Sequence, residues 1–159
     1  VFSHRDLHSR NIMCLSDGAC AVIDFQDAVI GPITYDFVSL TKDCYVRRSP
    51  AEVDKFALEF REKLVQRNLL SKDKNASKFI EWVDFMGLQR HLKVLGIFSR
   101  LHLRDGKHSY LTHLPLVIDY VLETILRYGG SDPVISEFNY WFEYTVRPVI
   151  ARQSWIQSN

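Results

Sequence analysis

The first residues of the chain carry three polar side chains whose types and spacing suit phosphoryl transfer to a hydroxyl group. A His-Arg-Asp sequence ends at Asp6, Asn11 follows five residues later, and an apolar run ends at Asp24. Asp6 would accept or orient the proton of the attacking hydroxyl. Asn11 and Asp24 offer hard oxygen ligands of the kind that suit magnesium, which neutralises the charge that develops on phosphate oxygens. The pattern therefore predicts a catalytic base beside a metal site.

The elements around these residues explain how they would meet. Residues 12–15 and 19–23 are short apolar runs joined by Ser16-Asp17-Gly18, and Asp-Gly between apolar runs is a hairpin signal. In an antiparallel pair the start of one strand lies beside the end of the next. We therefore expect Asn11 and Asp24 to face one ion.

Most of the remaining chain has helical periodicity. A capping-box pattern with proline at the first helical position opens a helix at residues 49–52. The other expected helices cover residues 35–45, 78–103 and 115–128, and a last one opens at Asp132-Pro133 and is kinked or ended by Pro148. We expect an α+β fold that is mostly helical.

Length and composition indicate one globular domain over residues 1–159. Of these residues 47% are hydrophobic and 25% are charged, which is ordinary for such a domain. A formal net charge of +1 gives no reason to expect nucleic acid or an anionic membrane as partner, and no apolar run reaches the length of a membrane span.

The cysteines indicate a reducing compartment. There are three, with no Cys-x-x-Cys pair, which favours reduced thiols over a disulfide scaffold. Cys14 and Cys20 flank the expected turn, and we expect them to be small buried side chains. No signal-peptide pattern begins at Val1, so the sequence favours a cytoplasmic protein.

These motifs resemble the aminoglycoside phosphotransferase superfamily, whose fold is like that of protein kinases. The resemblance lies in His4 to Asp6 with Asn11, in Asp24, and in Gly31-Pro32 with Asp36. The stretches 4–13, 23–40, 86–98 and 104–107 are further similar to bacterial kinases that phosphorylate the anomeric hydroxyl of N-acetylmuramate and N-acetylglucosamine in peptidoglycan recycling. The similarity covers most of residues 2–128.

The resemblance implies a set of roles. Asp6 would be the catalytic base, Asn11 and Asp24 would bind Mg²⁺, and Asp36 would brace the catalytic loop through its backbone. The substrates would be ATP and an N-acetylated amino sugar. The chain would be the C-terminal lobe of the kinase-like fold, with its small β hairpin beside the catalytic loop. The N-terminal nucleotide-binding lobe is absent, so we expect the isolated chain to be inactive.

Further candidates surround this set. We expect His4 to hold the loop by hydrogen bonding rather than to act as an acid or base. Gln26 stands where protein kinases carry a glycine, which argues against a protein kinase, and it is a candidate for substrate binding. Three roles remain open for the Asp27 side chain: it could support the metal ligands, contact the sugar, or be a solvated charge of the loop.

Arg90 and His91 interrupt the apolar face of the long predicted helix. They form either the polar stripe of an amphipathic helix or a sugar-binding edge, where Arg90 would pair with a lactyl carboxylate through its planar fork. The aromatic residues at 138–144 are expected in the core rather than as a sugar-stacking platform.

Two alternatives remain. The same fold acting on an aminoglycoside, choline or homoserine would need an acidic acceptor pocket, whereas residues 86–107 are basic on balance. The second alternative is a non-catalytic helical fragment that serves in protein interactions. Loss of Asp6, Asn11 or Asp24 would have indicated such a fragment, and all three residues are present.

Overall fold

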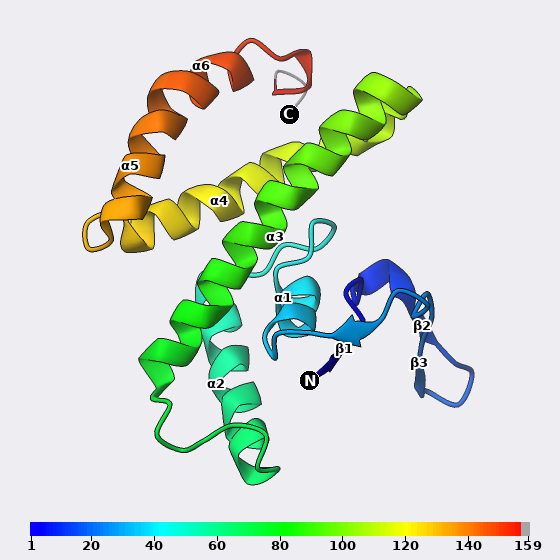
Figure 1. Ribbon diagram of the computed structural model, residues 1–159. Coiled ribbons are helices and arrows are strands. Elements are labelled where there is room, and N and C mark those ends of the chain that lie inside the picture. Colours follow the sequence, from blue (N-terminus) through cyan, green and yellow to red (C-terminus); the bar gives the residue numbers. More distant parts are fainter. Residues whose placement is uncertain (157–159) are drawn as a thin grey trace. The chain divides into compact units, whose positions relative to one another are not determined.

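The computed structural model describes residues 1–156, which form two compact units divided after Gly87. The first unit holds two small antiparallel sheets, the 3-10 helix η1 (Ser9–Asn11) and two α-helices, and the long helix α3 (Ala76–Asp105) begins in it and continues into the second unit (Figure 1). The second unit is helical. An α+β fold that is mostly helical is thereby confirmed, whereas the single domain over residues 1–159 stays a prediction.

The expected hairpin is present. Strand β2 (Ile12–Cys14) pairs antiparallel with β3 (Cys20–Val22), and Met13 faces Ala21 in the register. Gly18 has φ +82°, a left-handed conformation that glycine adopts without a steric penalty and that the turn requires.

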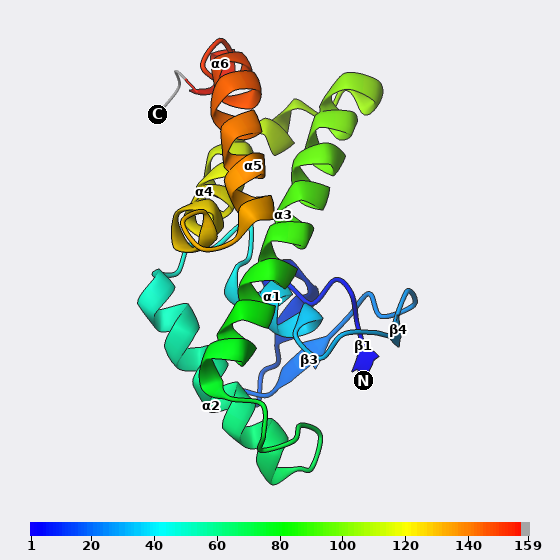
Figure 2. The same cartoon turned by 60° about the vertical axis from the view of Figure 1, so that its left-hand side comes forward.

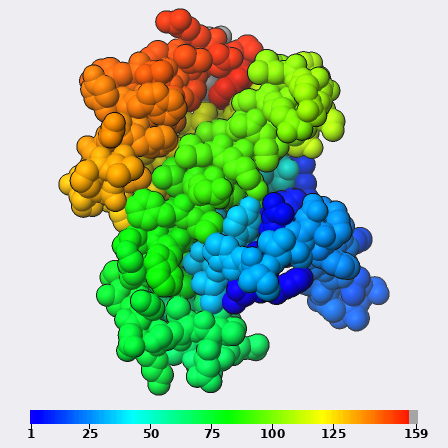
Figure 3. All heavy atoms as spheres, viewed as in Figure 1, coloured from blue at the N-terminus to red at the C-terminus, as the bar shows by residue number. Residues whose placement is uncertain are grey.

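The expectation that Cys14 and Cys20 are buried is wrong, because both are exposed. Met13, which precedes Cys14 and points to the opposite face of the strand, is exposed too. Both faces of this two-stranded hairpin therefore reach solvent near its turn. In the space-filling view many atoms of the first thirty residues, in blue, are visible at the surface (Figure 3).

The second sheet joins segments far apart in the sequence. Strand β1 (Phe2–Ser3) pairs antiparallel with β4 (Val29–Ile30), and the two lie side by side (Figure 2). The N-terminal amine also donates to the carbonyl oxygen of Gly31 at 3.0 Å. Strands of two residues carry no recognisable periodicity, so the sequence did not indicate β4.

Helices α1 (Tyr35–Thr41) and α2 (Pro50–Gln66) pack with the start of α3 around the core of the first unit. Helix α1 ends at Thr41 instead of Tyr45 because Lys42 leaves the helical conformation, with φ −114° and ψ 47°. The buried core consists of Val38, Val53, Ala57, Leu64, Phe79 and Val83.

The predicted capping box at the start of α2 is confirmed. The Ser49 hydroxyl accepts from the Glu52 backbone N–H at 3.3 Å, and the Glu52 carboxylate accepts from the Ser49 backbone N–H at 2.9 Å. A carboxylate that receives hydrogen bonds favours its charged form. The hydrogen bond from the Ser49 hydroxyl, followed by that from its backbone N–H, lowers the pKa of Glu52.

This lowered pKa gives a pH-dependent prediction. Because the pKa of Glu52 is lower in the folded state, its contribution to stability is present above the ordinary glutamate pKa and is lost as pH falls through the folded value. We expect Ser49→Ala to raise the pKa of Glu52 toward its ordinary value, because the hydroxyl hydrogen bond is lost while the backbone N–H bond remains, and to reduce the loss of stability at acid pH that comes from this carboxyl group. An NMR titration of the carboxyl groups measures it, with exposed Glu59 as reference, and an unchanged Glu52 pKa would contradict the assignment.

The second unit is built from the end of α3 and the helices that follow it. They are η2 (His108–His113), α4 (Leu114–Tyr128), α5 (Pro133–Trp141), the π-helical segment η3 (Phe142–Val146), α6 (Arg147–Ile150) and η4 (Ser154–Ile156). The break expected near Pro148 is confirmed as the π-helical segment followed by α6. Within residues 1–156, none of the helices combines the length and the apolar character that a membrane crossing needs.

The prediction that residues 138–144 are core is only partly correct. Phe142 is buried, but the side chains of Tyr140 and Tyr144 are 67% and 71% exposed. Helix α5 is short and contacts α4, and a helix packed on one side buries one stripe of its surface. Tyr140 and Tyr144, four residues apart, are both exposed, and their rings contact each other at a centroid distance of 4.5 Å with the planes tilted by 41°.

Candidate active site

The carboxylate of Asp36, in the first turn of α1, holds the start of the predicted catalytic loop. Its two oxygens accept from the backbone N–H groups of His4, at 2.6 Å, and of Arg5, at 2.9 Å. Arg5 has φ +70°, a conformation that costs free energy for a residue with a side chain and persists where the surroundings hold it. These two hydrogen bonds hold the backbone at Arg5, the residue in the left-handed conformation, and at its neighbour His4.

The ring of His4 also has structural contacts. Its Nε2 lies 2.9 Å from the Ile23 carbonyl oxygen, and its Nδ1 accepts from the Asp6 backbone N–H at 3.3 Å. This pattern fits the tautomer with the proton on Nε2. The side chain is buried and connects the loop to the end of the hairpin; its role in supporting a catalytic loop stays a prediction.

Asp6 presents its carboxylate to solvent at the centre of the loop. Its side chain is 51% exposed, and one oxygen lies 3.4 Å from Nε2 of His8. The main chain below it is fixed, because the Asn11 side-chain amide donates to the Asp6 carbonyl oxygen at 2.9 Å. An exposed carboxylate on a held backbone can reach a hydroxyl group that enters from solvent.

Asn11 and Asp24 lie at adjacent ends of the hairpin, as the sequence predicted. The Ile23 backbone N–H donates to the Asn11 carbonyl oxygen at 3.1 Å, one step beyond the β2–β3 pairs. Asp24 follows with φ +67°, and one of its oxygens accepts from the Gln26 side-chain amide at 2.8 Å.

This donor set fits magnesium by its chemistry. Asn11 uses its amide nitrogen within the loop, which leaves a neutral oxygen for a cation, and Asp24 adds an anionic one. Both are ligand types that magnesium takes, usually with several waters. Among residues 1–156 there is no cluster of three or more His, Cys, Asp or Glu side chains that could hold a metal, and a pair of one amide and one carboxylate is not a cluster of that kind.

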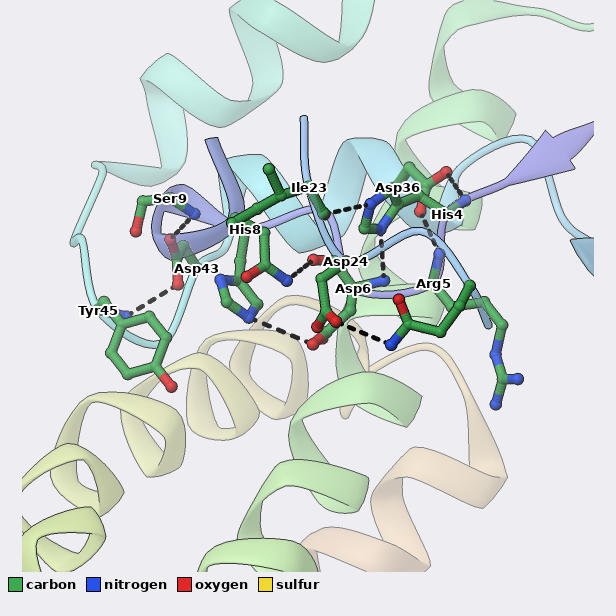
Figure 4. A network of polar contacts seen from close by, with 12 residues as sticks. His4, Arg5, Asp6, His8, Ser9, Ile23, Asp24, Asp36, Asp43 and Tyr45 are labelled. Atoms are coloured by element: carbon green, nitrogen blue, oxygen red, sulfur yellow. Dashed lines mark hydrogen bonds and ion pairs between the residues drawn. The ribbon is translucent and has the colours of Figure 1, made fainter. Parts of the chain in front are cut away.

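Asp43 is a second brace, which sequence reasoning missed. Its buried carboxylate accepts from the backbone N–H groups of Ser9, at 2.9 Å, and Tyr45, at 3.0 Å. Figure 4 shows Asp36 with His4 and Arg5 at one end of the network, and Asp43 with Ser9 and Tyr45 at the other. Asp43 lies beyond the end of α1, and its partner Ser9 is 34 positions away, so no local pattern of the sequence indicated it.

Tyr45 adds an aromatic contact at the same end of the loop. The Arg10 guanidinium lies 3.6 Å from the centre of its ring, and the His8 ring meets it edge-on at 5.5 Å. The loop between the two aspartates is therefore held at both ends, with Asp6 between them.

We expect Asp43→Ala to destabilise the protein by about 1.5–3 kcal/mol, the usual contribution of hydrogen bonds to a charged group. Two backbone N–H groups lose their carboxylate acceptor, so amide exchange at Ser9 and Tyr45 should accelerate as well. Chemical denaturation and hydrogen exchange measure the two effects. Glu59→Ala, at an exposed carboxylate on α2, is the matched control, and equal exchange rates in both variants would contradict the bracing role.

Three further residues predicted to contact substrate are Asp27, Arg90 and His91. Asp27 is exposed, and its carbonyl oxygen lies 3.4 Å from an Arg5 guanidinium nitrogen. Arg90 and His91 belong to the second unit and are buried, and the His91 ring stacks on Tyr120 at 4.6 Å. Their substrate roles, and that of Gln26, stay predictions.

Comparison with known proteins shows which family the segment with the loop and the hairpin resembles. Residues 1–68, which contain the braced loop, the hairpin and α1, match the phosphotransferase enzyme family. The family resemblance predicted from the sequence is confirmed.

Curated relatives extend the similarity along the chain. A protein of Neisseria meningitidis serogroup B named N-acetylmuramate/N-acetylglucosamine kinase is 40% identical over 134 residues, which cover 84% of this chain. Proteins with the same name from Pseudomonas putida and Caulobacter vibrioides are 40% and 32% identical over 86% and 96% of the chain. The chain spans about two fifths of the length of these relatives, at 40%, 39% and 40%.

Proposed function

We propose that the protein is an ATP-dependent phosphotransferase that acts on the anomeric hydroxyl of an N-acetylated amino sugar, N-acetylmuramate or N-acetylglucosamine. The observation that carries the proposal is the exposed Asp6 carboxylate on a loop braced by two aspartates, with Asn11 and Asp24 at the adjoining end of the hairpin. The names of the relatives support the choice of acceptor.

Asp6 would accept a hydrogen bond from the sugar hydroxyl and orient its oxygen toward the γ-phosphate. Holding the reacting groups in this way supplies a large part of the acceleration, because little covalent chemistry is left for the protein. Asn11 and Asp24 would hold magnesium, which neutralises charge on the phosphate oxygens when it is bound. Gln26 would fix the Asp24 carboxylate for this purpose.

The remaining components of the enzyme belong to the same proposal. The chain is the C-terminal lobe of a kinase-like fold, and an N-terminal lobe supplies the glycine-rich loop and lysine that bind the nucleotide. Asp27, Arg90 and His91 would contribute to sugar binding. The protein would work in the cytoplasm, where ATP is available, with peptidoglycan recycling as its context.

The test is magnesium-dependent ATP turnover by protein extended upstream of Val1, with N-acetylmuramate and N-acetylglucosamine offered separately. Formation of a sugar 1-phosphate, identified by phosphorus NMR, is the expected result. Turnover only with an aminoglycoside, choline or homoserine would replace the acceptor and keep the kinase. Folded protein that binds no magnesium nucleotide would overturn the proposal in favour of an interaction fragment.

A further inference from the structure

Cys14 and Cys20 occupy directly opposite positions in the β2–β3 hairpin. The backbone hydrogen bonds on either side of the two cysteines show whether they form a hydrogen-bonded or a non-hydrogen-bonded pair of the ladder. Leu15 donates to the Ala19 carbonyl oxygen at 2.8 Å and Ile23 to that of Asn11 at 3.1 Å. Hydrogen-bonded and non-hydrogen-bonded pairs alternate along an antiparallel ladder, so the two cysteines form a non-hydrogen-bonded pair.

This kind of pair brings side chains closest together. Its Cα atoms lie about 4.5 Å apart and both side chains leave the same face of the ladder. A disulfide needs a Cα separation of about 4.4–6.8 Å, so the two thiols can join without movement of the strands. Both cysteines are free and exposed, and Cys44 lies outside the hairpin.

We propose that Cys14 and Cys20 form a dithiol site that reacts with low-molecular-weight disulfides and closes into a cross-strand disulfide. One thiolate attacks a sulfur of the small disulfide, forms a mixed disulfide and releases one small thiol. The second cysteine thiolate then attacks the protein sulfur of the mixed disulfide and expels the second small thiol. Two protein thiols are oxidised, one small disulfide is reduced to two thiols, and the two protons leave with them.

The site has a defined structural consequence. The hairpin begins directly after Asn11 and ends at Val22, two residues before Asp24. A covalent bond across it ties together the two strands that carry the predicted metal ligands at their ends. We expect amide exchange within the hairpin to slow on oxidation, while the helices keep their exchange rates.

The experiment treats the reduced protein with oxidised glutathione and maps the products by mass spectrometry after non-reducing digestion. The expected product is a Cys14–Cys20 linked peptide with Cys44 outside it, and free-thiol titration should show two of the three thiols lost. Cys44→Ser should give the same product, because it keeps the pair.

The variants Cys14→Ser and Cys20→Ser distinguish two cysteines that react as a pair from two thiols that react independently. Each should stop at a stable mixed disulfide with glutathione on the remaining hairpin cysteine, a species that the unaltered protein does not accumulate. Stable glutathione adducts on both cysteines of the unaltered protein, or a disulfide that links Cys44, would overturn the proposal. The result does not depend on kinase activity, so it stands apart from the test of function.

Discussion

We expect replacement of Asp6 by asparagine to lower the proposed kinase turnover by about 10²–10⁴-fold, the range that a positioned general base contributes. Asparagine keeps the size of the side chain and the hydrogen bond from the Asn11 amide, since that bond goes to the main-chain oxygen of residue 6. It removes the anionic oxygen that, in the proposed reaction, would accept the proton of the attacking hydroxyl. The loss should therefore fall on kcat, with KM for the sugar changed little.

The measurement is steady-state turnover with ATP and sugar, by protein extended upstream of Val1, beside a test of folding. Because the Asp6 side chain is 51% exposed, the variant should unfold at the same denaturant concentration as the unaltered protein. Glu59→Gln, at an exposed carboxylate on α2, is the matched control and should keep full activity. A folded Asp6→Asn variant with undiminished kcat would remove Asp6 from the reaction.

Asp84→Ala should have the largest effect on stability, a loss of about 3–5 kcal/mol, because it removes one partner of a buried ion pair. The Lys42 ammonium lies 2.7 Å from the Asp84 carboxylate, and the two side chains are only 7% and 4% exposed. A buried charge that loses its counter-charge keeps its desolvation cost. This pair joins the end of α1 to α3 within the first unit, next to the core around Val83.

Chemical denaturation of the chain measures this loss, and two further variants test its cause. The double variant Lys42→Met with Asp84→Leu should recover most of the stability, because both buried charges are gone. Glu81→Ala breaks the exposed ion pair between Lys78 and Glu81 on the same helix and should cost at most about 1 kcal/mol. Equal losses for Asp84→Ala and Glu81→Ala would contradict the argument from burial.

Local interactions explain most of what could be predicted from the sequence. The hairpin depends on Asp17-Gly18 and the start of α2 on Ser49 and Glu52, and in each case the residues that interact are two to four positions apart. Helical periodicity likewise located α3 and α4 to within two residues at each end. The order Asp6, Asn11, Asp24 indicated phosphoryl transfer because these groups need only a loop and a hairpin to meet.

Interactions between distant residues could not be predicted in this way. The bonds from Asp36 to the His4 backbone and from Asp43 to the Ser9 backbone join residues 32 and 34 positions apart, and the ion pair of Lys42 with Asp84 joins residues 42 apart. Exposure of Cys14, Cys20, Tyr140 and Tyr144 also depends on which faces other elements cover. The candidate residues for phosphoryl transfer and the hairpin that carries two of them could thus be predicted from local sequence patterns. Which side chains are buried, and which carboxylates hold the loop, depends on neighbours that only packing brings together.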